Sequence, residues 1–86
     1  MQVNEKTFRA LVDAGAVRRV RIIADGARFH VEADTQNDTL IASTGRGAPR
    51  TFGTLDATAR WMHRLGLGSA QLDVSRWQPG QRGLAV

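Results

Sequence analysis

The chain has 86 residues, of which 42% are hydrophobic and 23% are charged, and it contains no cysteine. This length and balance predict a single small folded domain, and the lack of cysteine excludes disulfide scaffolds, cysteine-based zinc sites and thiol chemistry. Lys and Arg outnumber Asp and Glu by 12 to 8. The excess is uneven, because residues 1–34 hold six basic and five acidic side chains and residues 35–86 hold six and three. A basic surface in the second half makes nucleic-acid binding a hypothesis to test.

No segment of the sequence is suited to enter a membrane. The apolar runs are far shorter than the ~20 residues that a membrane-spanning helix needs. The first ten residues, MQVNEKTFRA, lack the basic and then apolar layout of a signal peptide. We therefore expect a cytoplasmic protein that makes no membrane contact.

The first predicted element is a short helix over residues 4–14, with the sequence NEKTFRALVDA. Asn4 can cap its N-terminus and Gly15 can end it. Its apolar side chains form a narrow stripe, so we expect this helix to pack on the rest of the domain.

A β-hairpin is predicted next, because residues 17–34 alternate between apolar and polar side chains on both sides of Asp25-Gly26. These two residues suit the positive φ angles of a two-residue type I′ turn. Such a turn places Ile22 opposite Phe29 and separates an apolar inner face from a polar outer face.

A third strand is predicted after the four-residue loop 35–38, since this loop places Ala33 opposite Leu40 on the same inner face. The glycines and the proline of residues 44–49 then predict a longer loop. A brief extended piece is expected at residues 50–52.

A helix over residues 55–65 and a strand over residues 70–74 complete the predicted order, α-β-β-β-α-β. This order is typical of a two-layer α+β domain, in which helices cover one face of an antiparallel sheet of three to four strands. We expect residues 1–77 to form one such domain and residues 78–86 to be an irregular C-terminal tail.

The helix over residues 55–65, capped by a threonine and ended by a glycine, is apolar along one side. Three of its side chains are expected to enter the core: Leu55, Met62 and Leu65. Trp61 lies at the edge of the stripe, where we expect it to cover the margin of the core.

The opposite side of this helix is basic. Arg60, His63 and Arg64 lie on it, and Arg46 and Arg50 precede it in the chain. One interpretation is an ordinary solvated face, and the other is a surface that binds the phosphates of DNA. Arg46 lies between two glycines and can approach a nucleic-acid backbone closely.

A second candidate surface is the outer face of the predicted sheet. Four basic side chains project from it: Arg19, Arg21, Arg28 and His30. A three-stranded sheet can enter the major groove and read bases with such side chains. Glu32 and Asp34 dilute the charge of this face, so a solvated face is the competing interpretation.

The sequence carries no pattern typical of a catalytic or metal site. His30 and His63 have no partner at metal-ligand spacing, and the serines have no nucleophile context. The stretch GRGAPR lacks the Gly-Lys-Ser/Thr ending of a phosphate-binding loop. We expect a protein that is not an enzyme and that binds neither a metal nor a cofactor.

Two resemblances bear on function. The stretch RTFGTLDATARWM is similar to the strand-to-helix passage of three-stranded-sheet DNA-binding domains, such as plant ethylene-response factors and the arm-binding domains of phage integrases. Over the whole chain, NEKTFRALVDAGAVRRVRI, GTLDATARWMHRLGLG and LDVSRWQPGQRGLAV resemble the ParC-type partition-associated family of plasmids and integrative elements. That resemblance implies an accessory role in plasmid partition, through DNA or through the partition ATPase, and it implies no particular site residues.

Two functional hypotheses follow. The first is a non-enzymatic accessory protein of a mobile genetic element that binds DNA through its arginines. The second is an adaptor that contacts a partition ATPase, another partition protein or a second copy of itself, through Trp61, Trp77 and an open sheet edge. A structural domain with an ordinary basic surface is also compatible with the composition.

Overall fold

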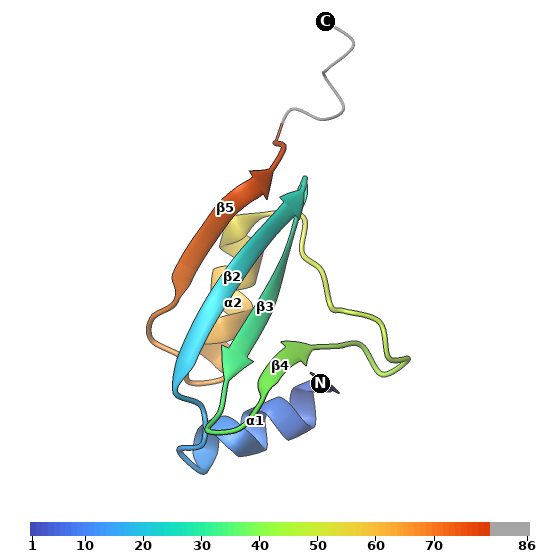
Figure 1. The fold of residues 1–86 in the computed structure, drawn as a ribbon. Helices are drawn as coiled ribbons and strands as arrows, with labels where there is room; N and C mark the ends of the chain where they lie inside the picture. The colour runs from blue at the N-terminus through green and yellow to red at the C-terminus, as the bar shows by residue number, and fades with distance from the viewer. Residues whose placement is uncertain (80–86) are drawn as a thin grey trace, which may run out of the picture.

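The structure is a computed structural model, and it describes residues 1–79 of the chain. In chain order the elements are β1 (Gln2–Val3), α1 (Glu5–Asp13), β2 (Arg19–Gly26), β3 (Arg28–Asp34), β4 (Thr39–Ala42), α2 (Leu55–Arg64) and β5 (Gln71–Trp77). They form a five-stranded sheet with α2 packed against one face and α1 across its lower end, where Phe8 joins the same core (Figure 1).

The sheet is mixed. Its strand order is β1-β4-β3-β2-β5, and β3 is antiparallel to both β2 and β4. The two edge strands are parallel to their neighbours, β1 to β4 and β5 to β2. The predicted α+β class is therefore confirmed, whereas the predicted antiparallel sheet of three to four strands and the exact element order are wrong.

The two edge strands account for this difference. β5 follows α2, and a crossover through a helix returns the chain in the direction of the preceding strand, so β5 runs parallel to β4 and β2. β1 has only two residues and directly precedes the helix cap at Asn4, so no alternation of side chains reveals it.

The β2–β3 hairpin has a different turn from the predicted one. Asp25 is paired with Arg28, so the turn residues are Gly26 and Ala27. Gly26 has a positive φ of 63° and Ala27 does not, which fits a type II′ turn. The predicted type I′ turn would have required a positive φ at Asp25, which is costly for a residue with a Cβ atom.

This turn moves the hairpin register by two residues. Ile22 faces Val31, so the predicted pair of Ile22 and Phe29 does not form. Because the side-chain period of a strand is two, the same side chains stay on the inner face. The pairing of the third strand is confirmed, since Ala33 faces Leu40.

The loop between β4 and α2 is tied to the sheet by backbone hydrogen bonds, and Arg50 N–H donates one to the carbonyl oxygen of Ala42 at 2.9 Å. Phe52 and Phe29 exchange two backbone hydrogen bonds, at 2.8 and 2.9 Å. The extended piece predicted at residues 50–52 is thus present as an isolated bridge and not as a strand.

Both helices begin at the predicted caps. The Asn4 Oδ1 atom accepts a hydrogen bond from the N–H of Thr7 at 2.8 Å, and Thr54 Oγ1 accepts one from the N–H of Ala57 at 3.0 Å. After α2 the chain turns at Gly66, whose φ is 89°. The capping pattern of the sequence therefore located both helix starts.

Trp61 and Leu55 lie differently from the prediction. Trp61 is only 1% exposed and packs between Phe8 and Phe52, with ring centroids 5.7 and 5.6 Å away. α1 and the loop before α2 therefore bury the edge of the stripe. Leu55 is 40% exposed, because it borders a hollow beside β5. The other predicted core residues of α2 are buried: Met62 and Leu65.

β5 extends to Trp77, three residues beyond the predicted strand at 70–74. The predicted tail over residues 78–86 lies outside the described residues from Gly80 onward. Neither of the helices described in residues 1–79 is long and apolar enough to cross a membrane.

Candidate nucleic-acid interface

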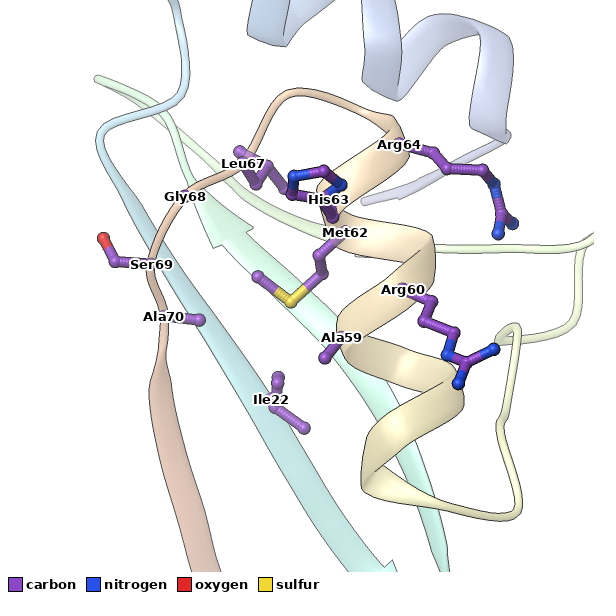
Figure 2. Close-up of a pocket in the computed structure, with 10 residues that line it drawn as sticks. All are labelled: Ile22, Ala59, Arg60, Met62, His63, Arg64, Leu67, Gly68, Ser69 and Ala70. Carbon is purple, nitrogen blue, oxygen red and sulfur yellow. The ribbon is translucent and has the colours of Figure 1, made fainter.

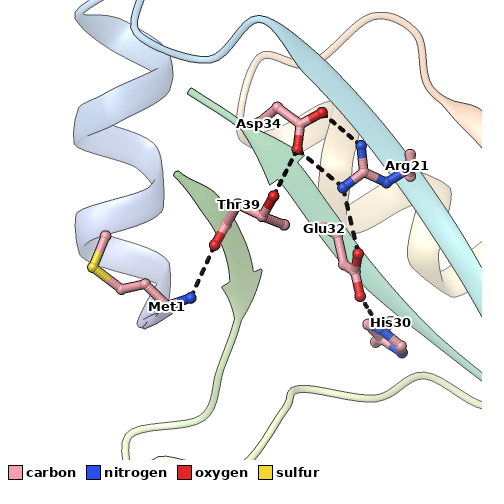
Figure 3. Close-up of polar contacts among 6 residues, drawn as sticks. All are labelled: Met1, Arg21, His30, Glu32, Asp34 and Thr39. Carbon is pink, nitrogen blue, oxygen red and sulfur yellow. Dashed lines mark hydrogen bonds and ion pairs between the residues drawn. The ribbon is translucent and has the colours of Figure 1, made fainter. Parts of the chain in front are cut away.

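The outer face of the sheet carries a network of ion pairs (Figure 3). Arg21 on β2 donates two hydrogen bonds to Asp34 on β3, from Nη1 to Oδ2 at 2.7 Å and from Nη2 to Oδ1 at 3.1 Å. Its Nη2 also lies 3.4 Å from Glu32 Oε1, and His30 Nε2 lies 3.0 Å from Glu32 Oε2. The hydrogen bond between Arg21 and Asp34 is the main cause that raises the pKa of Arg21 and lowers the pKa of Asp34.

Asp34 also links this network to β4. Thr39 Oγ1 donates to Asp34 Oδ1 at 3.1 Å, and the amino group of Met1 donates to the Thr39 carbonyl oxygen at 2.9 Å (Figure 3). The carboxylate is therefore surrounded by donors from the protein itself, which favours a structural role.

The remaining arginines of the outer face are similarly engaged or balanced. Arg28 Nε donates to Thr51 Oγ1 at 2.9 Å, and Arg76 on β5 lies 3.6 Å from Asp25. Arg19 is exposed, as predicted. The four predicted basic residues thus lie on the outer face, but Arg21 is already paired with the carboxylates of Glu32 and Asp34.

Two basic residues predicted to bind phosphates share a flank of α2. Figure 2 shows the side chains of Arg60 and Arg64 extending from the same side of the helix. Arg60 Nε lies 3.0 Å from Asp56 Oδ2, and these side chains are 75% and 73% exposed. An exposed pair at this spacing contributes about 0.2–0.5 kcal/mol, so it leaves Arg60 able to exchange partners. No ion pair within residues 1–79 involves Arg64.

Arg50 is held against the same helix by aromatic rings. Its Cζ atom lies 5.3 Å from the ring centroid of Phe52 and 5.8 Å from that of Trp61. Stacking on rings orients the planar guanidinium. Its buried Nε has no hydrogen-bond partner among the described residues, and a buried donor without a partner gains free energy when an acceptor reaches it.

Arg50, Arg60 and Arg64 therefore converge on α2, and we call these three residues the arginine surface. Arg46 is exposed in the loop after β4, where its backbone N–H donates a hydrogen bond to Thr44 Oγ1 at 3.3 Å. His63 lines an apolar groove together with Arg60 and Arg64, and Figure 2 shows its ring turned away from their two guanidinium groups.

The net positive charge of the described residues is confined to one segment. Residues 1–79 hold eleven basic and eight acidic side chains, because one of the twelve, Arg82, lies beyond them, and their net charge is +3. The strands hold four basic and four acidic side chains. Residues 4–18 and 35–38 together hold three basic and three acidic side chains. Residues 44–65 hold four arginines and one aspartate, which accounts for the whole excess of +3.

Sequence reasoning missed two contacts that shape this region. Trp61 Nε1 donates a hydrogen bond to Glu5 Oε1 at 2.8 Å, which joins the two helices across 56 positions of sequence. The available signal is that a buried indole usually needs an acceptor. The stacking of Arg50 was also missed, although its spacing of two from Phe52 in an extended piece places both side chains on one face.

Within residues 1–79, no three side chains of His, Asp or Glu are grouped so that they could hold a metal ion. Comparisons with protein-family models, with curated proteins and with solved structures find no match. What the chain does must therefore be inferred from its own geometry.

Proposed function

We propose that this chain is a non-enzymatic accessory protein that binds DNA through contacts between its arginine surface and the phosphate backbone. The observation that carries the proposal is the distribution of charge. The sheet is electrically balanced, while the loop before α2 and α2 itself carry the entire net charge of +3. A local excess of arginine attracts the phosphate backbone of nucleic acids.

The arrangement of the three arginines favours phosphates over bases as the groups contacted. Arg60 and Arg64 are one helical turn apart on an exposed flank, and Arg50 is pre-oriented by the rings beneath it. Such contacts fix a protein on the duplex without reading its sequence. Arg46, in the loop that leads to this helix, is proposed to extend the same surface.

The setting that we propose follows from the resemblance to the ParC-type partition-associated family. In that setting the chain acts beside the partition machinery of a plasmid or integrative element, and its DNA contact brings it to the replicon. A partition ATPase or another partition protein is the proposed protein partner.

The salt dependence of duplex binding tests this function. Each phosphate contact contributes about −0.9 to the slope of log K against log salt concentration, so three arginines predict a slope of about −2.7. That slope corresponds to a loss of affinity of about 40-fold between 50 and 200 mM salt. We expect Arg64→Ala to reduce the slope by about 0.9 in a fluorescence-anisotropy titration of a labelled duplex.

Arg19→Ala is the matched control, because it removes the same charge from the exposed outer face of the sheet. It should leave the slope unchanged. The proposal fails if no binding is detected at 50 mM salt, or if both variants reduce the slope equally.

A further inference from the structure

Exposed apolar side chains gather on the inner face beside α2. Five large apolar side chains are exposed in residues 1–79, and four of them lie here: Leu55, Leu72, Val74 and Trp77, each 40–47% exposed. They line a hollow of about 340 Å³. Exposed apolar residues are common singly, but a contiguous group marks an interaction site.

A second hollow, of about 620 Å³, adjoins the first along α2. Ile22 at its floor is the strand partner of Leu72, and Ala59 at its wall is one helical turn from Leu55. Figure 2 shows Ile22, Ala59 and Met62 directed into the space between α2 and the chain that leads to β5. We call the two hollows together the β5 strip.

The length of the β5 strip matches one helix. α2 lies mainly on β3 and leaves β5 uncovered by the described helices, since all seven residues of β5 are exposed. The inner-face residues of β2 are buried, by contrast: Val20, Ile22 and Ala24. The seven residues of β5 span about 23 Å, the length of a helix of about 15 residues.

The described residues 1–79 of a second copy offer no free helix to place there. α1 buries Phe8 and packs Leu11 and Val12 on its own core, and α2 buries Trp61 and Met62. The apolar stripes of both described helices are therefore already used, so we expect the docking helix to belong to a partner protein.

The charges beside the strip indicate the chemistry of that helix. The charged residues that line the two hollows are Arg60, His63 and Arg64, and no Asp or Glu lines either of them. α2, which forms one wall, belongs to the segment that carries the whole positive excess. Complementary potentials steer association, so acidic side chains beside the apolar stripe of a partner helix suit this wall.

We infer that the β5 strip is the docking site for an amphipathic helix of a partner protein, with an apolar stripe that packs on Ile22, Leu72 and Val74 and with acidic residues along its flank. This is the helix-in-groove mode of recognition. The site borders the proposed DNA contact, because Arg60 and Arg64 also line the larger hollow, but its apolar contacts lie on β2 and β5 and its test uses a peptide and no duplex.

A synthetic peptide of 15 residues tests the inference. Its helix carries leucine at positions i, i+3, i+4, i+7 and i+11 and glutamate beside them, and the comparison peptide has lysine in place of every glutamate. Titration into the ¹⁵N-labelled full-length chain should shift the amide signals of β5 and α2. We expect the glutamate peptide to bind at least tenfold more tightly than the lysine peptide.

Two variants locate the site. Leu72→Glu should weaken binding of the glutamate peptide at least tenfold, while Gln71→Glu adds the same charge on the outer face and should change it less than twofold. Ala59→Trp fills the groove from an exposed helix position, keeps the core intact and should also weaken binding at least tenfold.

Three results would overturn the inference. The first is no binding of the glutamate peptide at 1 mM, and the second is equal affinity for both peptides. The third is a dimer in sedimentation that Leu72→Glu dissociates, because the strip would then belong to a second copy of the chain.

Discussion

The indole of Trp61 ties α2 to α1, and its removal should destabilise the whole domain. The side chain is 1% exposed, and its Nε1 donates to Glu5 Oε1 at 2.8 Å. It also packs edge-on against Phe8, with ring centroids 5.7 Å apart. Trp61→Phe keeps a ring in this place but removes the donor and part of the buried surface.

The cost of Trp61→Phe has two parts. A hydrogen bond to a charged group contributes about 1.5–3 kcal/mol, and the lower end applies because Glu5 is only partly buried. The apolar atoms that are lost add about 1–2 kcal/mol. We therefore expect a decrease of about 3 kcal/mol in the free energy of unfolding, a large share of the total for a domain of this size.

A double-mutant cycle separates the two parts. Urea unfolding followed by far-UV circular dichroism gives the free energies of unfolding of Trp61→Phe, Glu5→Ala and the double variant. If the hydrogen bond forms, the two substitutions should show a coupling of about 1–2 kcal/mol. A coupling below about 0.3 kcal/mol would refute the contact and with it the placement of α1 against α2.

Two further predictions concern the pH dependence and the turns. The lowered pKa of Asp34 means that its ionised form stabilises the fold above its ordinary pKa of 3.8 and that this contribution is lost as the pH falls through the lowered pKa. Asp34→Asn should therefore flatten the acid side of a plot of urea midpoint against pH, and an unchanged acid side would contradict the Arg21–Asp34 pair. Gly66→Ala should cost about 1–2 kcal/mol because φ is 89° there, whereas Gly68→Ala, with no positive φ and no atom within 4 Å of the new Cβ, should be neutral or stabilising. Equal melting temperatures for these two glycine variants would contradict the conformation described at Gly66.

Local patterns in the sequence were sufficient for the helices and the central strands. The caps at Asn4 and Thr54 and the alternation around the hairpin depend on neighbouring residues, so they can be read directly. The parallel edge strands depend on tertiary pairing. The sequence of Gln71–Trp77 contains no signal that this strand pairs with β2, and β1 has too few residues to show a pattern of alternation.

The candidate site was predictable only for the residues whose positions follow from the period of a single helix, α2. The helical period places Arg60, His63 and Arg64 on one side of α2, but it does not show that the ring of His63 turns away from the two arginine side chains (Figure 2). The dilution of the outer face by Glu32 and Asp34 was predicted, but the ion pairs of Arg21 were not, because the predicted register with Ile22 opposite Phe29 puts Arg21 opposite His30. In the actual register Arg21 faces Glu32, and Asp34 lies two residues further along β3 on the same outer face. The ion pairs of Arg21 can therefore be predicted only when the turn is placed correctly.

The burial of Trp61 was missed for a similar reason. A helical stripe alone does not show which neighbouring element covers its edge. Here two rings cover it: Phe8 of α1, which is 53 positions before Trp61 in the sequence, and Phe52, which is nine positions before it.

The most direct test of the account is a map of the duplex on the protein surface. An NMR titration of the ¹⁵N-labelled chain with a duplex at 50 mM salt follows every backbone amide at once. We expect the largest shifts to fall within residues 44–65, with Arg50, Arg60 and Arg64 at their centre. Shifts centred on the outer faces of β2 and β3, or no shifts at all, would contradict it.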